Sequence, residues 1–223
     1  DAKTYFVSHK KQYDIIISEP SNPWVSGVAG LFSEEFYRQM HDHLTEKGLF
    51  VQWIQLYEID VKLVVSVLKA ISSIYPDFAA YAATDGDMII IASKIGLVPK
   101  LDSTIFGIPW IAKSLHEIQI DNIQDISIRR IGTRKVLRTA LETFPVRANS
   151  DYYPVLDQNA SRTRFLQSNA QDLLDYARLP LPLLEMLLAE EFPWGSTDIH
   201  PSSSYYPSLS AYGAMALRDY VVS

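Results

Sequence analysis

The sequence predicts an α/β fold: a mixed, doubly wound sheet with an antiparallel edge strand, followed by a mostly helical C-terminal extension. Three observations lead to this prediction. Short β-branched apolar runs alternate with helical periodicity as far as Pro76. Asp85-Gly86 between two apolar runs is a hairpin signal. From Pro99 onward the period becomes irregular and then helical, so we divide the chain into residues 1–98 and residues 99–223.

The first predicted strand covers residues 13–18, YDIIIS, a short apolar run of the kind found in parallel strands that are buried on both faces. Residues 19–27, EPSNPWVSG, then form a loop rich in turn residues. Ser33 is suited to cap the helix that follows. The apolar stripe of that helix consists of Phe36, Met40 and Leu44. Gly48 is expected to end the helix.

A second strand is predicted at residues 49–54, and Asp60 is expected to cap the next helix. That helix has apolar residues at helical spacing from Val61 to Ile71. Residues 78–83 and 88–92 are the expected strands of the hairpin.

The second half carries mainly helical patterns. We expect a helix over residues 128–144 and further helices in three segments near the C-terminus, residues 170–176, 181–190 and 210–221. Residues 193–208, rich in Ser, Pro and Tyr, are expected to form a loop.

Composition excludes several classes of protein. The 223 residues contain no cysteine, which excludes disulfides, a thiol nucleophile and thiolate metal sites. The net charge of −6 argues against a general nucleic-acid binder. His41 and His43 are two apart on a predicted helix and point to different faces, so we expect no metal site. Because the chain begins at Asp1 without a signal-like segment, it is interpreted as a fragment of a longer protein.

Candidate site residues lie in the loops that leave the carboxyl ends of the first two strands, where open α/β sheets bind ligands. Glu19, Ser21 and Asn22 lie in the first loop, and Gln55, Tyr57 and Glu58 in the second. A carboxylate, amides and an aromatic ring together suit a ligand amine. The alternative is a rigid turn with a solvated Glu19, and that alternative stays open. We interpret Trp24 and Trp53 as packing residues.

Residues 13–32, YDIIISEPSNPWVSGVAGLF, resemble the spermidine synthase (polyamine aminopropyltransferase) family, most closely its bacterial branch that is often fused to membrane segments. Three further segments resemble that family: Asp1-Ala2, residues 48–52 (GLFVQ) and residues 149–157 (NSDYYPVLD). The resemblance implies a partial Rossmann-like sheet of the S-adenosylmethionine-dependent methyltransferase type in residues 1–98.

The resemblance also implies an activity: transfer of an aminopropyl group from decarboxylated S-adenosylmethionine to a diamine or polyamine. It assigns Glu19 as catalytic base and amine anchor, Asn22 to a second acidic position of the family, and Asp1 to the adenine of the donor. Gln52 would face the substrate. The donor is a co-substrate, so no tightly bound cofactor and no metal are expected, and the glycine-rich donor loop would precede Asp1.

Two other functions stay open beside this one. They are an S-adenosylmethionine-dependent methyltransferase, and a catalytically silent Rossmann-like module for interaction or sensing, favoured by an Asn at position 22. The expected partner is a small polyamine and not a nucleic acid. A homodimer, and membrane segments in the full-length protein, are left open. The expected location is the cytoplasm, or the cytoplasmic face of a membrane if such segments exist.

Overall fold

A computed structural model of the chain describes residues 2–127 and 129–174. It contains two compact units, one formed by residues 1–98 and 132–173 and the other by residues 99–131 and 174–223. The first unit therefore combines the predicted sheet region with a segment that returns to it from the second half of the sequence.

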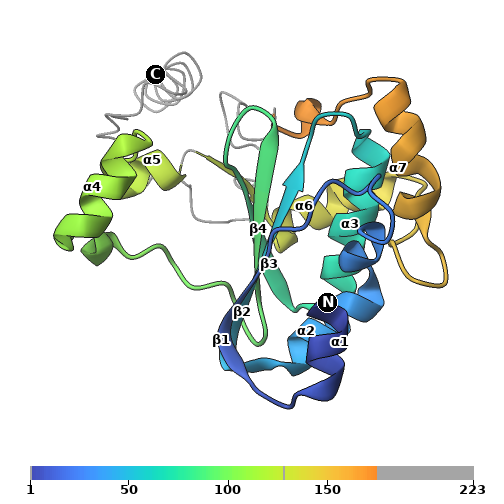
Figure 1. The fold of residues 1–223 in the computed structure, drawn as a ribbon. Helices are drawn as coiled ribbons and strands as arrows, with labels where there is room; N and C mark the ends of the chain where they lie inside the picture. Colours follow the sequence, from blue (N-terminus) through green and yellow to red (C-terminus); the bar gives the residue numbers. More distant parts are fainter. Residues whose placement is uncertain (1, 128, 175–223) are drawn as a thin grey trace. The chain divides into compact units, whose positions relative to one another are not determined.

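A mixed five-stranded sheet is the framework of the described chain (Figure 1). Its strands are β1 (Tyr13–Ser18), β2 (Leu44–Gln55), β3 (Asp77–Ala82), β4 (Asp87–Ser93) and β5 (Arg130–Thr133). The order is β1-β2-β4-β3-β5, with β1 and β2 parallel and β4 antiparallel to both β2 and β3. The α/β class and the hairpin are thus confirmed. The antiparallel strand β4 lies inside the sheet and not at its edge, because β3 pairs on its far side.

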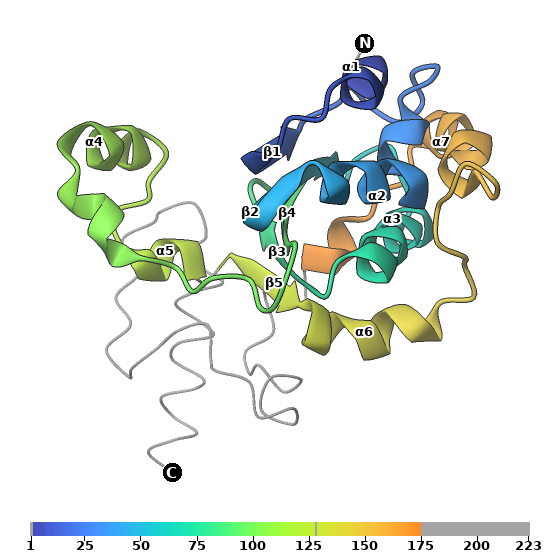
Figure 2. The same ribbon diagram turned by 90° about the horizontal axis from the view of Figure 1, so that it is seen from below.

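The first unit also contains helices and 3-10 turns, which lie before, between and after the strands in the sequence. They are α1 (Ala2–Ser8), the 3-10 turn η1 (Ala29–Phe32), α2 (Glu34–Asp42), α3 (Val61–Ile74), α6 (Arg134–Thr143), α7 (Val155–Phe165) and the 3-10 turn η3 (Gln171–Leu174). Figure 2 shows α2 and α3 on one side of the strands, with α7 beyond α3. None of the helices among the described residues is long and apolar enough to cross a membrane.

Both predicted N-caps are present. The Ser33 hydroxyl accepts a hydrogen bond from Phe36 N at 3.3 Å, and Asp60 Oδ1 accepts one from Leu63 N at 2.9 Å. The predicted end of α2 was wrong, since Leu44 already pairs with Tyr13 as the first residue of β2. Gly48 lies within that strand, where a Cβ would stand 2.9 Å from the Leu44 side chain.

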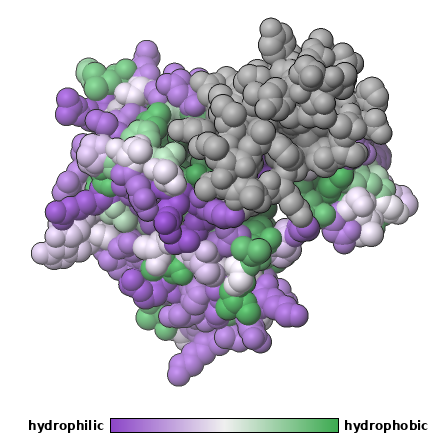
Figure 3. Space-filling model, turned by 180° about the vertical axis from the view of Figure 1, so that it is seen from behind, coloured by the Kyte–Doolittle hydropathy of each residue, from purple (hydrophilic) through white to green (hydrophobic). Residues whose placement is uncertain are grey.

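The sheet has one well-buried face. The even-numbered residues Phe50, Gln52 and Ile54 of β2 are fully buried on the side of α2 and α3. The prediction that both faces of β1 are buried was wrong: Ile15 and Ile17 are 57% and 69% exposed, because no described element covers that side of this edge strand. In the view from behind, hydrophobic residues appear among hydrophilic ones on the described surface (Figure 3).

An aromatic cluster fills the space between the sheet and the helices. The Phe50 ring stacks on Tyr75 with centroids 5.7 Å apart and meets Tyr37 edge-on at 5.5 Å. Burial raises the pKa of the Tyr37 and Tyr75 hydroxyls well above the usual range. Such rings bury much apolar area and position β2 firmly against α2 and α3.

The second unit is described for residues 99–131 except 128, and for Leu174. It contains the 3-10 turn η2 (Ser103–Gly107), α4 (Pro109–Glu117) and α5 (Ile123–Ser127). The carboxylate of the fully buried Asp125 organises the start of α5 by accepting hydrogen bonds from the backbone N–H groups of Asp121 and Asn122.

The predicted helix over residues 128–144 is shorter than expected. Residues 130–133 form strand β5, and the helix α6 begins only at Arg134. Of the predicted helix over residues 170–176, the described part is the 3-10 turn η3. The predictions for residues 181–190, 193–208 and 210–221 lie outside the described residues.

Asn149 joins several of these elements from a buried position, with 2% of its surface exposed. Its side-chain amide donates to the carbonyl oxygens of Ala29 and Phe32 at 3.4 and 3.0 Å, and its Oδ1 accepts from Leu156 N at 2.9 Å. Its backbone also forms hydrogen bonds with α2 and α3. One side chain therefore ties the loop after β1 to the first turn of α7.

Replacing Asn149 by Ala should lower the free energy of unfolding by about 3 kcal/mol, because a buried donor and acceptor are lost and their partners stay buried without replacement. Urea unfolding measures the change. The matched control is Asn159→Ala, which removes only a side-chain hydrogen bond to Val155 O within α7 and should lower stability by less than about 1 kcal/mol. Equal losses in the two variants would contradict the role assigned to Asn149.

Candidate functional site

The candidate site lies where β1 and β2 end. The two strands are parallel and Ser18 is in register with Gln52, so their carboxyl ends meet at one edge of the sheet. Glu19 follows β1 directly, and its side chain is exposed. This exposure fits both a base that awaits substrate and a solvated turn, so its catalytic role stays a proposal.

The Gln52 side chain is fully buried, and only its amide nitrogen has hydrogen-bond partners among the described residues. Its amide nitrogen donates to Ser18 O at 3.1 Å and to Trp53 O at 2.8 Å, which holds the side chain across the ends of both strands. Its carbonyl oxygen Oε1 is buried and receives no hydrogen bond from the described residues. A free acceptor is thus fixed beside the loop that begins at Glu19.

Gln55, the last residue of β2, is more unusual. It is fully buried, and neither atom of its carboxamide has a hydrogen-bond partner among the described residues. A buried polar group without a partner destabilises a protein by about 1–3 kcal/mol, and such groups are rare outside functional sites and water sites. Gln55 can therefore both donate to and accept from a ligand.

The two loops contact one another beyond the strands. Asn22, which is half-buried, donates its amide hydrogen to the Tyr57 hydroxyl over 3.5 Å. The Tyr57 ring lies against Gly86, where a Cβ would stand 3.2 Å from ring atom Cδ1. Ser21 is exposed on the first loop. The structure therefore brings Asn22 and Tyr57 together, as well as Gln52 and the end of β1.

The segment after α7 runs along the second loop. Tyr57 forms a β-bridge with Asn169, and Ala170 N donates to Leu56 O at 2.7 Å. The side-chain amide of Gln171 reaches Asp85 O in the hairpin turn at 2.9 Å. Sequence reasoning missed this contribution, since nothing near residues 169–171 indicates a partner more than 80 residues away.

Asp1, expected to contact adenine, lies outside the described residues. No group of three His, Cys, Asp or Glu side chains in the described part of the chain is placed to hold a metal ion.

Residues 1–85 match the model of the spermine/spermidine synthase domain. These residues are similar to that family. The matched range contains both site loops and every predicted site residue, and the resemblance inferred from the motifs is confirmed. The synthase domain match ends just before β4, so the later elements of the first unit lie outside it.

Curated proteins with similar sequences are described as polyamine aminopropyltransferases. A polyamine aminopropyltransferase of Desulforudis audaxviator is 32% identical over 83 residues, which cover 37% of this chain and 30% of the relative. A polyamine aminopropyltransferase of Caldicellulosiruptor saccharolyticus is 30% identical over 130 residues, which cover 58% of this chain and 41% of the relative. The matches therefore span less than half the length of these relatives.

A solved structure, a probable spermidine synthase from Corynebacterium glutamicum, aligns with 17% identity and a TM-score of 0.44. The alignment covers 68% of this chain and 52% of that protein.

The contrast between Gln52 and Gln55 can be tested by stability. Gln55→Met should leave the free energy of unfolding unchanged or raise it by about 1 kcal/mol, because it removes a buried amide that has no partner. Gln52→Met should lower it by about 1–2 kcal/mol, because Ser18 O and Trp53 O lose their donor. Urea unfolding of both variants gives the answer. A loss at Gln55 as large as that at Gln52 would mean that the Gln55 amide is already satisfied.

Proposed function

We propose that the protein containing this chain transfers an aminopropyl group from decarboxylated S-adenosylmethionine to an amine. The observation that carries the proposal is the synthase domain match, which covers both site loops and the end of β2, where Gln52 and Gln55 have buried polar atoms without a partner among the described residues. Carboxamide oxygens accept hydrogen bonds from an amine, so these residues suit the acceptor substrate.

In the proposed reaction the amine nitrogen attacks the propyl carbon bonded to the sulfonium sulfur. A C–N bond forms as the C–S bond breaks, and the sulfur leaves as the neutral thioether of methylthioadenosine. The nitrogen must be unprotonated to attack, and Glu19 is the proposed group that takes its proton. The free Oε1 of Gln52 orients the nitrogen through a hydrogen bond, which contributes to the rate by positioning.

Asn22 shapes the choice of substrate in this proposal. It brings an amide where the family resemblance implies an acid, so it adds no negative charge beside the acceptor. The Tyr57 hydroxyl, already in contact with Asn22, completes a neutral polar wall. Such a wall binds an amine by hydrogen bonds and does not favour its protonated form.

The test is an assay of the natural full-length protein, whatever it carries beyond these residues, with decarboxylated S-adenosylmethionine and a panel of amines. Mass spectrometry detects methylthioadenosine and the aminopropylated amine. A parallel reaction with S-adenosylmethionine tests methyl transfer. A folded protein that forms neither product would identify the silent module instead.

Glu19→Gln should lower kcat for aminopropyl transfer by about 100-fold or more, because the amide cannot take the proton. Glu19→Asp should retain more activity, since it keeps a carboxylate. The matched control is Glu46→Gln, an exposed glutamate near the opposite end of β2, which should leave kcat unchanged. Transfer that survives Glu19→Gln at the full rate would remove Glu19 from the mechanism.

A further inference from the structure

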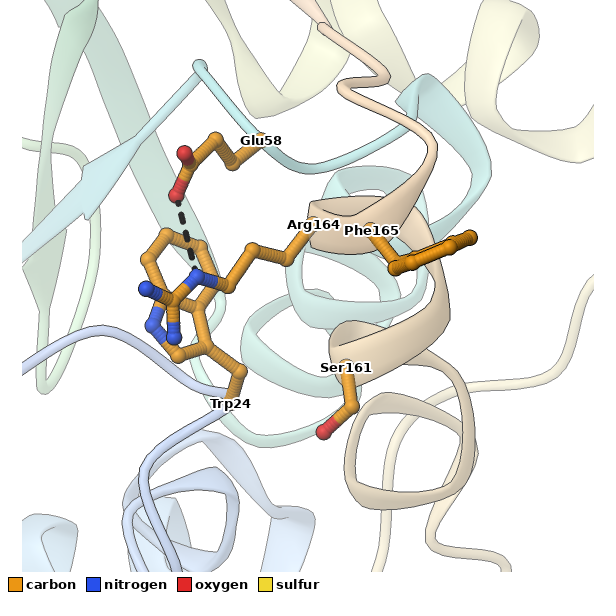
Figure 4. Close-up of a pocket in the computed structure, with 5 residues that line it drawn as sticks. All are labelled: Trp24, Glu58, Ser161, Arg164 and Phe165. Atoms are coloured by element: carbon orange, nitrogen blue, oxygen red, sulfur yellow. Dashed lines mark ion pairs between the residues drawn. The ribbon is translucent and has the colours of Figure 1, made fainter.

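An open pocket of about 330 Å³ lies beside the two site loops. Its lining comes from three segments of the first unit: the loop after β1, the loop after β2 and the last turns of α7 (Figure 4). The lining residues are Trp24, Glu58, Ser161, Arg164 and Phe165. None of them belongs to the acceptor residues described above, so the pocket is a distinct feature of the surface.

A cation of the protein itself lines this pocket and contacts two of the other lining residues. The Arg164 guanidinium carbon lies 5.1 Å from the centre of the Trp24 ring, and Arg164 Nε lies 3.6 Å from Glu58 Oε2. Figure 4 shows the arginine reaching from α7 across the indole to the carboxylate. An aromatic face beside a carboxylate is the pair of groups that binds an alkylammonium ion.

Trp24 and Glu58 are anchored independently of this arginine. Glu58 has a φ of 55°, a left-handed conformation that is strained for a non-glycine residue, and its carbonyl oxygen accepts a hydrogen bond from Thr163 at 3.2 Å. The next residue, Ile59, is fully buried. Trp24 directly follows the buried Pro23. The backbone that carries the ring and the carboxylate is therefore held by contacts that do not involve Arg164.

Arg164 is the movable part. More than half of its side chain is exposed, and it stands next to the end of α7 beside Phe165, which is 87% exposed. Exposed ion pairs and exposed cation–π contacts are each weak, so a competing cation can displace it.

The pocket adjoins the proposed acceptor site through both loops. Asn22 and Tyr57 are in contact, Trp24 lies two residues after the first, and Glu58 directly follows the second. A triamine held at one end by the acceptor site could therefore extend its third, charged nitrogen towards this pocket.

We propose that Trp24 and Glu58 form a subsite for a distal ammonium group of a polyamine, and that Arg164 fills this subsite until such a substrate displaces it. The inference rests on the proposed function, since it specifies which amines that site selects. An amine with a third nitrogen can occupy the subsite, whereas Arg164 competes with it and weakens its binding.

The test compares Kd values for the triamine spermidine and the diamine putrescine by calorimetry on the natural full-length protein. Arg164→Gln should bind spermidine roughly tenfold more tightly than the unchanged protein, the combined effect of one exposed ion pair and one cation–π contact. Its Kd for putrescine should stay within twofold. Adding Glu58→Gln to Arg164→Gln should abolish the gain. Arg162→Gln, an exposed arginine on the same helix, is the matched control for the change of net charge and should match the unchanged protein.

The result that overturns the subsite is a spermidine Kd that Arg164→Gln leaves unchanged, or a gain that putrescine or Arg162→Gln shares. If Arg164→Gln does not fold, NMR on the protein that retains Arg164 provides a second test. The NMR signal of Arg164 Nε–H, assigned through Arg164→Lys, should shift on addition of spermidine and not of putrescine; a signal unmoved by saturating spermidine would also overturn the subsite.

Binding and transfer separate the two proposals. A spermidine-specific gain in a protein that forms no aminopropylated product would support the subsite and refute the transfer reaction. Aminopropyl transfer with no Arg164-dependent change in spermidine binding would support the reaction and refute the subsite.

Discussion

The hydrogen bonds of buried Asn149 are the constraint on which the site geometry depends. Besides its side-chain bonds to the loop after β1 and to α7, its backbone N–H donates to Ser66 O in α3 and its carbonyl accepts from Glu34 N in α2, both at 3.0 Å. An asparagine can serve two acceptors and one donor at once, which neither Asp nor Leu can do. The loop that carries Trp24 and the helix that carries Arg164 are therefore placed relative to one another through this residue.

The elements that could be predicted are those determined by neighbouring residues. Ser33 and Asp60 cap their helices because a cap is a contact over three residues, and Asp85-Gly86 forms its turn for a similar local reason. The exposed face of β1 could not be predicted. An apolar run indicates that the residues are suited to burial, but it does not indicate whether another element covers them. α7 was missed because its buried positions, Leu156, Ala160 and Thr163, include two small side chains and give little apolar periodicity.

The same contrast between local signals and long-range contacts applies to the residues of the candidate site. Gln55 and Tyr57 were proposed because residues that follow a strand in an α/β sheet tend to face a ligand, whereas Gln52 was proposed only through the family resemblance. That the Gln55 carboxamide has no partner is a property of the packed molecule and has no sequence signal. Arg164 was missed, and Trp24 was interpreted as packing, because their contact joins segments 140 positions apart. The confirmed family resemblance does not reach Arg164, which lies beyond the matched residues 1–85.

Neutral and charged groups are separated in the proposed site, and the chemistry of amine transfer gives a reason for this. A carboxylate beside an amine favours the ammonium form, which cannot attack. Asn22, Gln52, Gln55 and Tyr57 instead offer neutral hydrogen-bonding groups, with Glu19 as the one carboxylate proposed beside the reacting nitrogen. The second carboxylate, Glu58, lies in the neighbouring pocket with Trp24, where a permanent positive charge is favourable. A polyamine bound across both regions would keep its distal nitrogen charged and anchored while the reacting nitrogen loses its proton. Arg164 supplies the distal charge when no substrate does, so Glu58 retains a cationic partner in the free protein.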